Sequence, residues 1–262
     1  MNSQRDFILE ICEAEHIAVE SLSKNYILRL RKGEIIRTVY GPFWDINNAA
    51  ADKIACDKCA CYAMLNESGV PAIEHQLLSH PIRRFGFTGE SGVWTNALNF
   101  FNRHKVIVVK PNNGSNGREI HLCNTVQTLE LAVQEIFETS PDVAISPFYK
   151  IKTEYRVFYL NGECYLIYGK SPSPDDWRHN LSQGATAFEV IGEKQALENL
   201  AKRAANAIGI TFASVDIAEL EDGKIVVMEI NSGVQARQML QQLPHLRDQV
   251  KNIYATAIKS MF

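Results

Sequence analysis

The feature that most constrains this chain is residues 214–231, SVDIAELEDGKIVVMEIN, in which two β-rich runs flank Asp222-Gly223. Asp-Gly between such runs is the strongest short signal for a β-hairpin. If these two residues form the whole loop, Glu221 pairs with Lys224, and the register of both strands follows by counting outward.

That register predicts two carboxylates opposite each other. Ala218 pairs with Val227, and two residues further along each strand Asp216 pairs with Glu229. Because side chains alternate between the two faces of a strand, Asn231 lies on the same face as Glu229. Opposed like charges destabilise a sheet, and the rest of this face is apolar. Mg²⁺ takes oxygen ligands of this kind. We therefore expect Mg²⁺ (or Mn²⁺) here; the alternative is a surface hairpin with a shared proton or a lysine partner.

A second signal is a glycine-rich loop after the apolar run KVIVVK. Lys110-Pro111 ends this run, and residues 112–117, NNGSNG, follow. Glycines let backbone N–H groups approach an anion, and a lysine at the strand end can neutralise a phosphate. The alternative is an ordinary connection between two strands. The Walker pattern of P-loop proteins is absent, since Gly169-Lys170-Ser171 matches only its tail.

Charge and hydropathy exclude some partners. Net charge −3 and a pI near 6.2 provide no positive footprint for nucleic acid or an anionic membrane. No apolar run approaches the roughly 18 residues of a membrane-spanning helix. The N-terminus, MNSQRDFILEICEAEH, is acidic and amphipathic, unlike a secretory signal. We expect a cytoplasmic protein.

The six cysteines include a C-x-x-C pair, Cys56 and Cys59, with Cys61 close behind. This spacing raises the possibility of zinc, but no second pair follows and the segment continues as a helical pattern. Reduced, incidental thiols are the favoured interpretation.

The remaining pattern predicts an α+β protein with three parts. Helices are expected over 5–15, 48–68, 93–103, 124–138 (capped by Asn124 with Gln127), 193–208 and 247–261. Strands are expected over 26–31, 34–40, 105–110, 118–122, 142–149, 154–160 and 163–168, the last two as a hairpin across Asn161-Gly162. The expected parts are a short N-terminal helix and hairpin (1–46), a small lobe (47–148) and a large lobe (149–262).

Read in order, the motifs resemble the ATP-grasp superfamily along most of the chain. They are DKIACDK, VIVVKPNNGSNG, AISPFYKIKTEYRVFYLNGE, YGKSP, DWRHNLSQGA, VDIAE and MEIN. DWRHNLSQGA is similar to a loop of the ribosomal-protein glutamate ligases, and NNAAADKIACDK to a helix of cyanophycin synthetases and bifunctional glutathione synthetases. The resemblance implies an ATP-grasp fold, two α+β lobes that hold ATP between them.

The resemblance also implies roles for individual residues. Two lysines, Lys58 and Lys110, would hold the ATP phosphates, and a mobile loop of Asn113, Gly114, Ser115, Asn116 and Gly117 would cover them. The backbone of an interlobe strand, Ser146, Pro147, Phe148 and Tyr149, would contact adenine. The carboxylate of Glu154 would bind the ribose hydroxyls. Lys170 would lie near the γ-phosphate, and Arg178 and Asn180 near the acyl phosphate or acceptor. Asp216, Glu229 and Asn231 would be the magnesium ligands. The alternative for the basic residues is a solvated surface.

Several positions depart from the family pattern. The interlobe strand starts with Ser146-Pro147 where relatives have an acidic or amide side chain, so adenine contact there falls to the backbone. Only about fifty residues precede Lys58, too few for the N-terminal α/β domain of many relatives, so a partner protein or a second copy is expected to replace that surface. His179 is a candidate base, although a lone loop histidine is more often exposed.

The resemblance implies a carboxylate–amine ligase that works through an acyl phosphate, with small-molecule or peptide substrates; positioning and charge neutralisation would be the protein's part in that chemistry. A small-molecule kinase on the same scaffold and a non-catalytic ATP-binding regulatory module are the alternatives.

Overall fold

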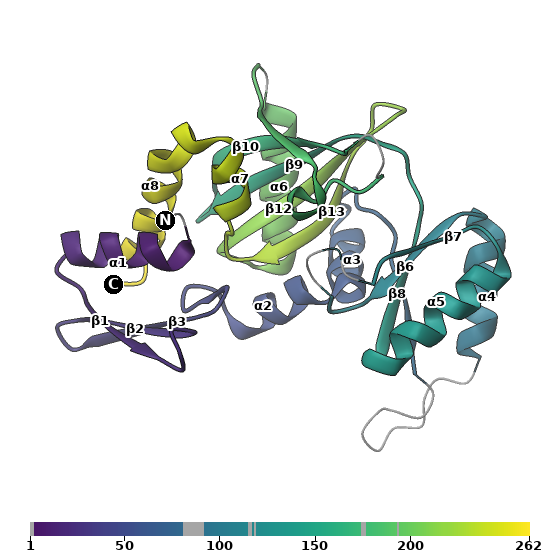
Figure 1. Ribbon diagram of the computed structural model, residues 1–262, viewed down its shortest axis with the longest axis horizontal. Coiled ribbons are helices and arrows are strands. Elements are labelled where there is room, and N and C mark those ends of the chain that lie inside the picture. Colours follow the sequence, from purple (N-terminus) through teal and green to yellow (C-terminus); the bar gives the residue numbers. More distant parts are fainter. Residues whose placement is uncertain (1–2, 81–91, 115–116, 118, 174–176, 193) are drawn as a thin grey trace.

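The computed structural model describes the whole chain except residues 1–2, 81–91, 115–116, 118, 174–176 and 193. Three antiparallel sheets organise it: β1-β2-β3-β4, β5-β8-β6-β7 and β11-β10-β9-β12-β13 (Figure 1). The helices are α1 (Gln4–Ala14), α2 (Ala49–Cys56), α3 (Lys58–Glu67), α4 (Val93–His104), α5 (Val126–Thr139), α6 (Gln195–Ile208), α7 (Arg237–Gln242) and α8 (Arg247–Lys259). No helix among the described residues is long and apolar enough to cross a bilayer.

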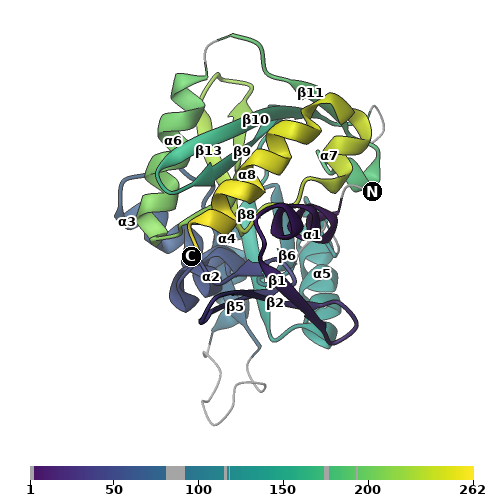
Figure 2. The ribbon, with the colours of Figure 1, turned by 90° about the vertical axis from the view of Figure 1, so that its left-hand side faces the viewer.

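The five-stranded sheet is the core of the large lobe. Its strands are β9 (Ile151–Leu160), β10 (Glu163–Ser171), β11 (Thr186–Glu189), β12 (Phe212–Leu220) and β13 (Ile225–Ser232). Helix α6 covers one face, and α8 lies across part of the other (Figure 2). The end of that second face nearest the small lobe is polar, and it carries the candidate site.

The β12–β13 hairpin confirms the pair of Asp216 with Glu229 but not the predicted turn. Leu220 N donates to the carbonyl of Lys224 (2.9 Å), so the loop has three residues instead of two. Its last residue, Gly223, has a positive φ of 83°, which favours glycine.

A bulge restores the predicted register further along. Ala218 pairs with Val226, not with Val227 as predicted, because the longer loop shifts the pairing by one residue. The shift ends between Ile217 and Asp216, where β13 contributes one extra residue, Met228. The two departures cancel, so the carboxylates still face each other.

The four-stranded sheet with α4 and α5 forms the small lobe. Its strands are β5 (Gln76–Ser79), β6 (Ile107–Pro111), β7 (His121–Cys123) and β8 (Asp142–Pro147). The apolar faces of α4 and α5 pack on one side of this sheet, where Phe100, Leu129 and Ile145 are buried. The other side faces the large lobe.

The N-terminal sheet packs on the large lobe through α1 and α8. Its strands are β1 (Ala18–Leu22), β2 (Ile27–Lys32), β3 (Ile35–Tyr40) and β4 (Phe43–Trp44). The buried Trp44 ring stacks on Tyr254 of α8, with centroids 5.7 Å apart. Asn47 fixes the connection to α2, because its side chain accepts from Phe212 N (2.8 Å) and donates to Phe212 O (2.9 Å).

The single helix predicted over 48–68 is wrong, because it is broken at Asp57. This residue is extended, with φ −109° and ψ 107°, and its carboxylate caps α3 by accepting from Ala60 N at 2.8 Å. The break places Lys58 in the first turn of α3, where its backbone N donates to Asn112 O (3.3 Å).

Other differences are smaller. Thr125 with Thr128, rather than Asn124 with Gln127, caps α5. Strand β11 and helix α7 were not predicted, because each is too short to show a clear period.

Candidate active site

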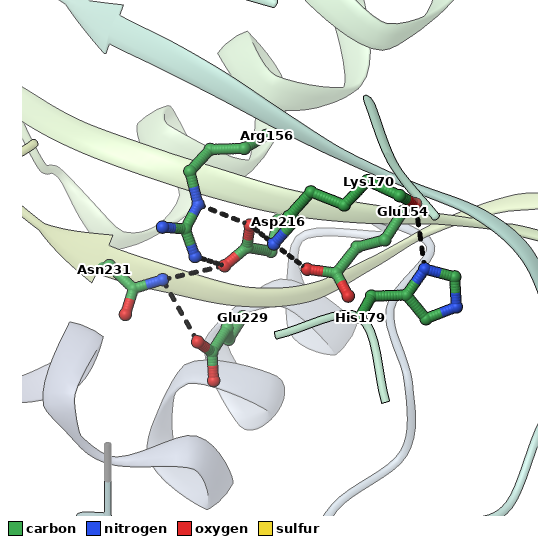
Figure 3. Close-up of polar contacts among 7 residues, drawn as sticks. All are labelled: Glu154, Arg156, Lys170, His179, Asp216, Glu229 and Asn231. Carbon is green, nitrogen blue, oxygen red and sulfur yellow. Dashed lines mark hydrogen bonds and ion pairs between the residues drawn. The ribbon is translucent and has the colours of Figure 1, made fainter. Parts of the chain in front are cut away.

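The candidate site lies on the polar end of the large-lobe sheet, where four strands contribute side chains to one face. The register sets Glu154 beside Lys170 and Ala218, and sets Asp216 beside Arg156. Alternation along the strands then points the charged side chains the same way (Figure 3). Two hairpins that are distant from each other in the sequence, β9–β10 and β12–β13, thus bring their charges together.

Asp216 is the centre of this cluster. Arg156 Nε and Nη2 donate to its two oxygens at 2.7 and 2.6 Å, and Lys170 Nζ donates at 3.1 Å. Burial alone would raise the pKa of Asp216, but the charges of Arg156 and Lys170 outweigh it and hold that pKa at about 2. The carboxylate is therefore ionised at neutral pH.

Asn231 joins the two carboxylates of the hairpin. Its amide nitrogen donates to Asp216 Oδ2 (3.0 Å) and to Glu229 Oε1 (3.1 Å). Both acids use these oxygens as acceptors, so the amide nitrogen faces them here, and a rotation of the amide would present Oδ1 to a cation instead. The structure thus brings together all three residues that the sequence predicts as metal ligands.

The donor set suits a hard divalent cation. No hydrogen bond within the described residues occupies Glu229 Oε2 or Asn231 Oδ1, and both are oxygens of the kind that Mg²⁺ binds. Asp216 would share its charge between the cation and Arg156. Within the described ranges no group of three His, Cys, Asp or Glu side chains could hold a metal; the third member of this set is an amide.

Lys170 links Asp216 to Glu154. Both Lys170 and Glu154 are buried, and they form an ion pair. Burial and Arg156 disfavour the charged lysine, yet Asp216 and Glu154 raise its pKa, so it stays protonated. An ammonium group has three donors, so one remains for an anionic ligand beyond these two acids.

Two lysines of the small-lobe side form a positively charged pair. Lys58 Nζ donates to the carbonyls of Gly114 (2.6 Å) and Asn112 (3.4 Å), which fixes the start of the glycine-rich loop. Lys110 has no hydrogen bond or ion pair with any residue that the structure describes. Burial, with Lys58 second, lowers the pKa of Lys110 to about 8. An anion such as phosphate would satisfy both cations.

The glycine-rich loop reaches the large lobe at Asn180. A Cβ built on Gly117 would stand 2.6 Å from Asn180 Nδ2, so a larger residue there would require the Asn180 side chain or the loop to move. Asn113 and Gly114 begin this loop, whereas Ser115 and Asn116 lie outside the described residues.

The hinge between the lobes borders a cavity of about 390 Å³. Phe148 and Tyr149 line it from the hinge, and Ile73, Leu220 and Val226 line it from the segment before β5 and from the hairpin. The preceding Ser146 and Pro147 are buried in β8. The cavity lies where a flat ring could enter between the lobes.

The loop after β10 carries Arg178, His179 and Asn180. The prediction of an exposed His179 is wrong: this side chain is 3% exposed, and its Nδ1 lies 2.9 Å from Lys170 O. Since a carbonyl only accepts, Nδ1 carries the proton. His179 thus fastens the loop to the strand of Lys170 (Figure 3).

Arg156 is the functional residue that the sequence analysis missed. No motif in the sequence around Arg156 assigns it a role. Its alternation with Glu154 puts the two on one face, but only the sheet order places Asp216 beside it.

Comparison with known proteins gives a consistent result. A model of the RimK-like ATP-grasp domain matches residues 55–245. An uncharacterized protein of Mycoplasma pneumoniae is 30% identical over 141 residues, 53% of this chain and 48% of that protein. A probable alpha-L-glutamate ligase of Aeromonas salmonicida is 27% identical over 130 residues, 48% of this chain and 42% of the ligase. The chain spans about half the length of the curated relatives it matches.

Solved structures share the fold at low identity. The D-alanine–D-alanine ligase from Bacillus anthracis superposes with a TM-score of 0.62 at 16% identity, covering 82% of this chain and 71% of that one. The D-cycloserine synthetase DcsG gives a TM-score of 0.60 at 19% identity, covering 80% and 71% of the two chains. Both likenesses concern the two-lobed fold.

Proposed function

The chain belongs to the RimK-like ATP-grasp domain family, and from this premise we propose that it binds ATP with Mg²⁺ and joins a carboxylate to an amine. The observation that carries the proposal is the contact of Asn231 with both Asp216 and Glu229. That contact places the Asn231 amide beside two opposed acids, and an amide turned so that its oxygen faces them would complete a cation site with them; the basic groups beside it suit a polyphosphate.

The nucleotide would lie along the face from the hinge to this site. Adenine would enter the cavity beside Phe148 and Tyr149. Glu154 has one oxygen that no described side chain occupies, and it suits a ribose hydroxyl. The phosphates would then reach Lys58 and Lys110.

Asp216, Glu229 and Asn231 would hold Mg²⁺, which when bound offsets phosphate charge. Lys170, and the edge of Arg156 that is turned away from Asp216, would donate hydrogen bonds to the phosphates and neutralise more of their negative charge. Positioning and charge account for most of the catalysis of phosphoryl transfer.

The reaction would run in two displacements. An oxygen of the substrate carboxylate attacks the γ-phosphorus, the bond to the β-phosphate oxygen breaks, and ADP leaves. The amine nitrogen then attacks the acyl carbon, phosphate leaves, and the nitrogen loses a proton. Arg178 and Asn180, held near Lys170 by His179, would contact the acyl phosphate. The contact of Gly117 with Asn180 would exclude water from it.

The test is an ADP-release assay with Mg²⁺ and ATP across single amino acids and short peptides, with and without added amines. L-Glutamate comes first, since relatives bear the name of glutamate ligases. The proposal expects free phosphate and an amide product that both depend on the amine. A stable phosphorylated product would identify a kinase instead, and ATP binding without turnover would identify a binding module.

A further inference from the structure

The segment that crosses between the lobes carries an unusual histidine. Ile73 N donates to Val227 O (2.9 Å) in the large lobe, and Gln76 pairs with Ile145 in the small lobe. His75 lies between these two points, one step before Gln76, which puts it level with Ser146. It therefore stands beside the first hinge residue.

The tautomer of His75 follows from its one hydrogen bond. Nδ1 lies 2.9 Å from Ile73 O, and a carbonyl only accepts, so Nδ1 carries the proton and Nε2 carries a lone pair. Burial, followed by the charge of Lys110, lowers the pKa of His75 well below its usual value, so the ring is neutral. His75 is thus a pure acceptor at Nε2.

That acceptor has no partner in the part of the chain that the structure describes. The side chain is 7% exposed, and Nε2 is buried without a hydrogen bond. An unsatisfied buried acceptor costs stability, and such groups are rare. The cost has an explanation if a ligand supplies the missing donor.

The surroundings indicate which donor that is. Ile73, two residues away, lines the cavity between the hinge and the hairpin, and Lys110 is the charge that acts most strongly on the ring. The hinge residue level with His75 in the register is Ser146, which is buried in β8 and offers only a short hydroxyl. An adenine has an amino donor at C6 beside the acceptor N7, which matches an imidazole acceptor beside an ammonium donor.

We propose that His75 is a specificity-determining residue that accepts a hydrogen bond from the 6-amino group of the nucleotide base. A guanine presents a carbonyl oxygen at that position, so its lone pair would oppose that of Nε2. The ring is covered in this structure, so the base reaches it as the two lobes adjust around the segment. This inference rests on the proposed nucleotide binding and adds the choice of base.

The test measures affinities by isothermal titration calorimetry with Mg²⁺ and three nucleotides: ATP, GTP and purine riboside triphosphate, which lacks only the 6-amino group. The wild type should bind ATP about tenfold more tightly than purine riboside triphosphate. His75→Phe removes the acceptor and keeps a flat ring. It should lower ATP affinity to that of purine riboside triphosphate, whose own affinity stays within about twofold.

Two further variants keep the test sharp. His75→Gln, whose amide oxygen can accept the same hydrogen bond, should retain the preference for ATP. His245→Phe alters an exposed histidine bonded to Glu189 and is the matched control, with no expected change. Unfolding midpoints without nucleotide confirm that each variant folds.

Equal weakening of all three nucleotides in His75→Phe, or no change in any, would overturn the inference while leaving nucleotide binding in place. If the wild type bound none of the three, the proposed function itself would fail, and this inference with it.

Discussion

Arg156 holds both oxygens of Asp216 in a two-point contact, at 2.7 and 2.6 Å, although the two residues lie on different strands. Asp216 is 3% exposed at its side chain, and Arg156 is 21% exposed. The pair therefore belongs to the interior of the site rather than to a solvated face.

Arg156→Leu should lower the free energy of unfolding by about 3 kcal/mol, because it leaves a buried carboxylate without its main partner. Replacing both residues in Arg156→Leu/Asp216→Leu should be less damaging than the sum of the single changes. Chemical denaturation measures both. The matched control is Lys152→Ala, which breaks an exposed pair with Glu219 on the same two strands and should cost under about 1 kcal/mol. Equal losses at the two sites would contradict the account.

Gly117→Ala should weaken ATP binding by about tenfold, because the added Cβ would collide with Asn180 and displace the glycine-rich loop. Its φ of 66° adds backbone strain. Gly33 has a similar φ of 58° but open space around it, so Gly33→Ala isolates the strain. Titration calorimetry should show a loss of affinity at position 117 alone; a matching loss at position 33 would rule out the collision.

Nucleotide affinity should fall as the pH rises through about 8, the pKa of Lys110, because phosphate binds the protonated amine. Without nucleotide the effect on stability is opposite. The folded pKa lies below the unfolded value of about 10.4, so the unfolded chain binds more protons and stability rises with pH between the two. Lys110→Met should remove both dependences and stabilise the free protein at pH 7. Affinities and unfolding midpoints at pH 6.5–9.5 check this, and a flat wild-type profile would refute it.

The sequence predicted the strands that carry the site better than it predicted which strands lie beside them in the sheet. Local signals were enough to predict the β12–β13 hairpin, but its loop has three residues, the last of which is Gly223, instead of the predicted two. The predicted pair of Asp216 with Glu229 is still formed, because the bulge at Met228 cancels the one-residue shift that the longer loop causes. Asp57 is a residue type that favours the N-cap of a helix, which is a signal for the break between α2 and α3. The helical pattern on both sides of Asp57 nevertheless led to the prediction of a single helix.

Long-range order was the part that the sequence could not supply. Arg156 meets Asp216 because β9 lies between β10 and β12, and no local pattern specifies that order. The burial of His75 has a related cause, since this residue lies between a contact with β13 of the large lobe and the pairing with β8 of the small lobe.

The most direct test of the account is the effect of Mg²⁺ on ATP affinity in the wild type and in Glu229→Gln, measured by titration calorimetry. Glu229 lies opposite Asp216 and bonds Asn231, so the amide variant keeps the shape and removes one charge. We predict that Mg²⁺ tightens ATP binding in the wild type by at least about tenfold and that Glu229→Gln loses most of this gain. An equal gain in both proteins would contradict the assignment of the cation to these three residues.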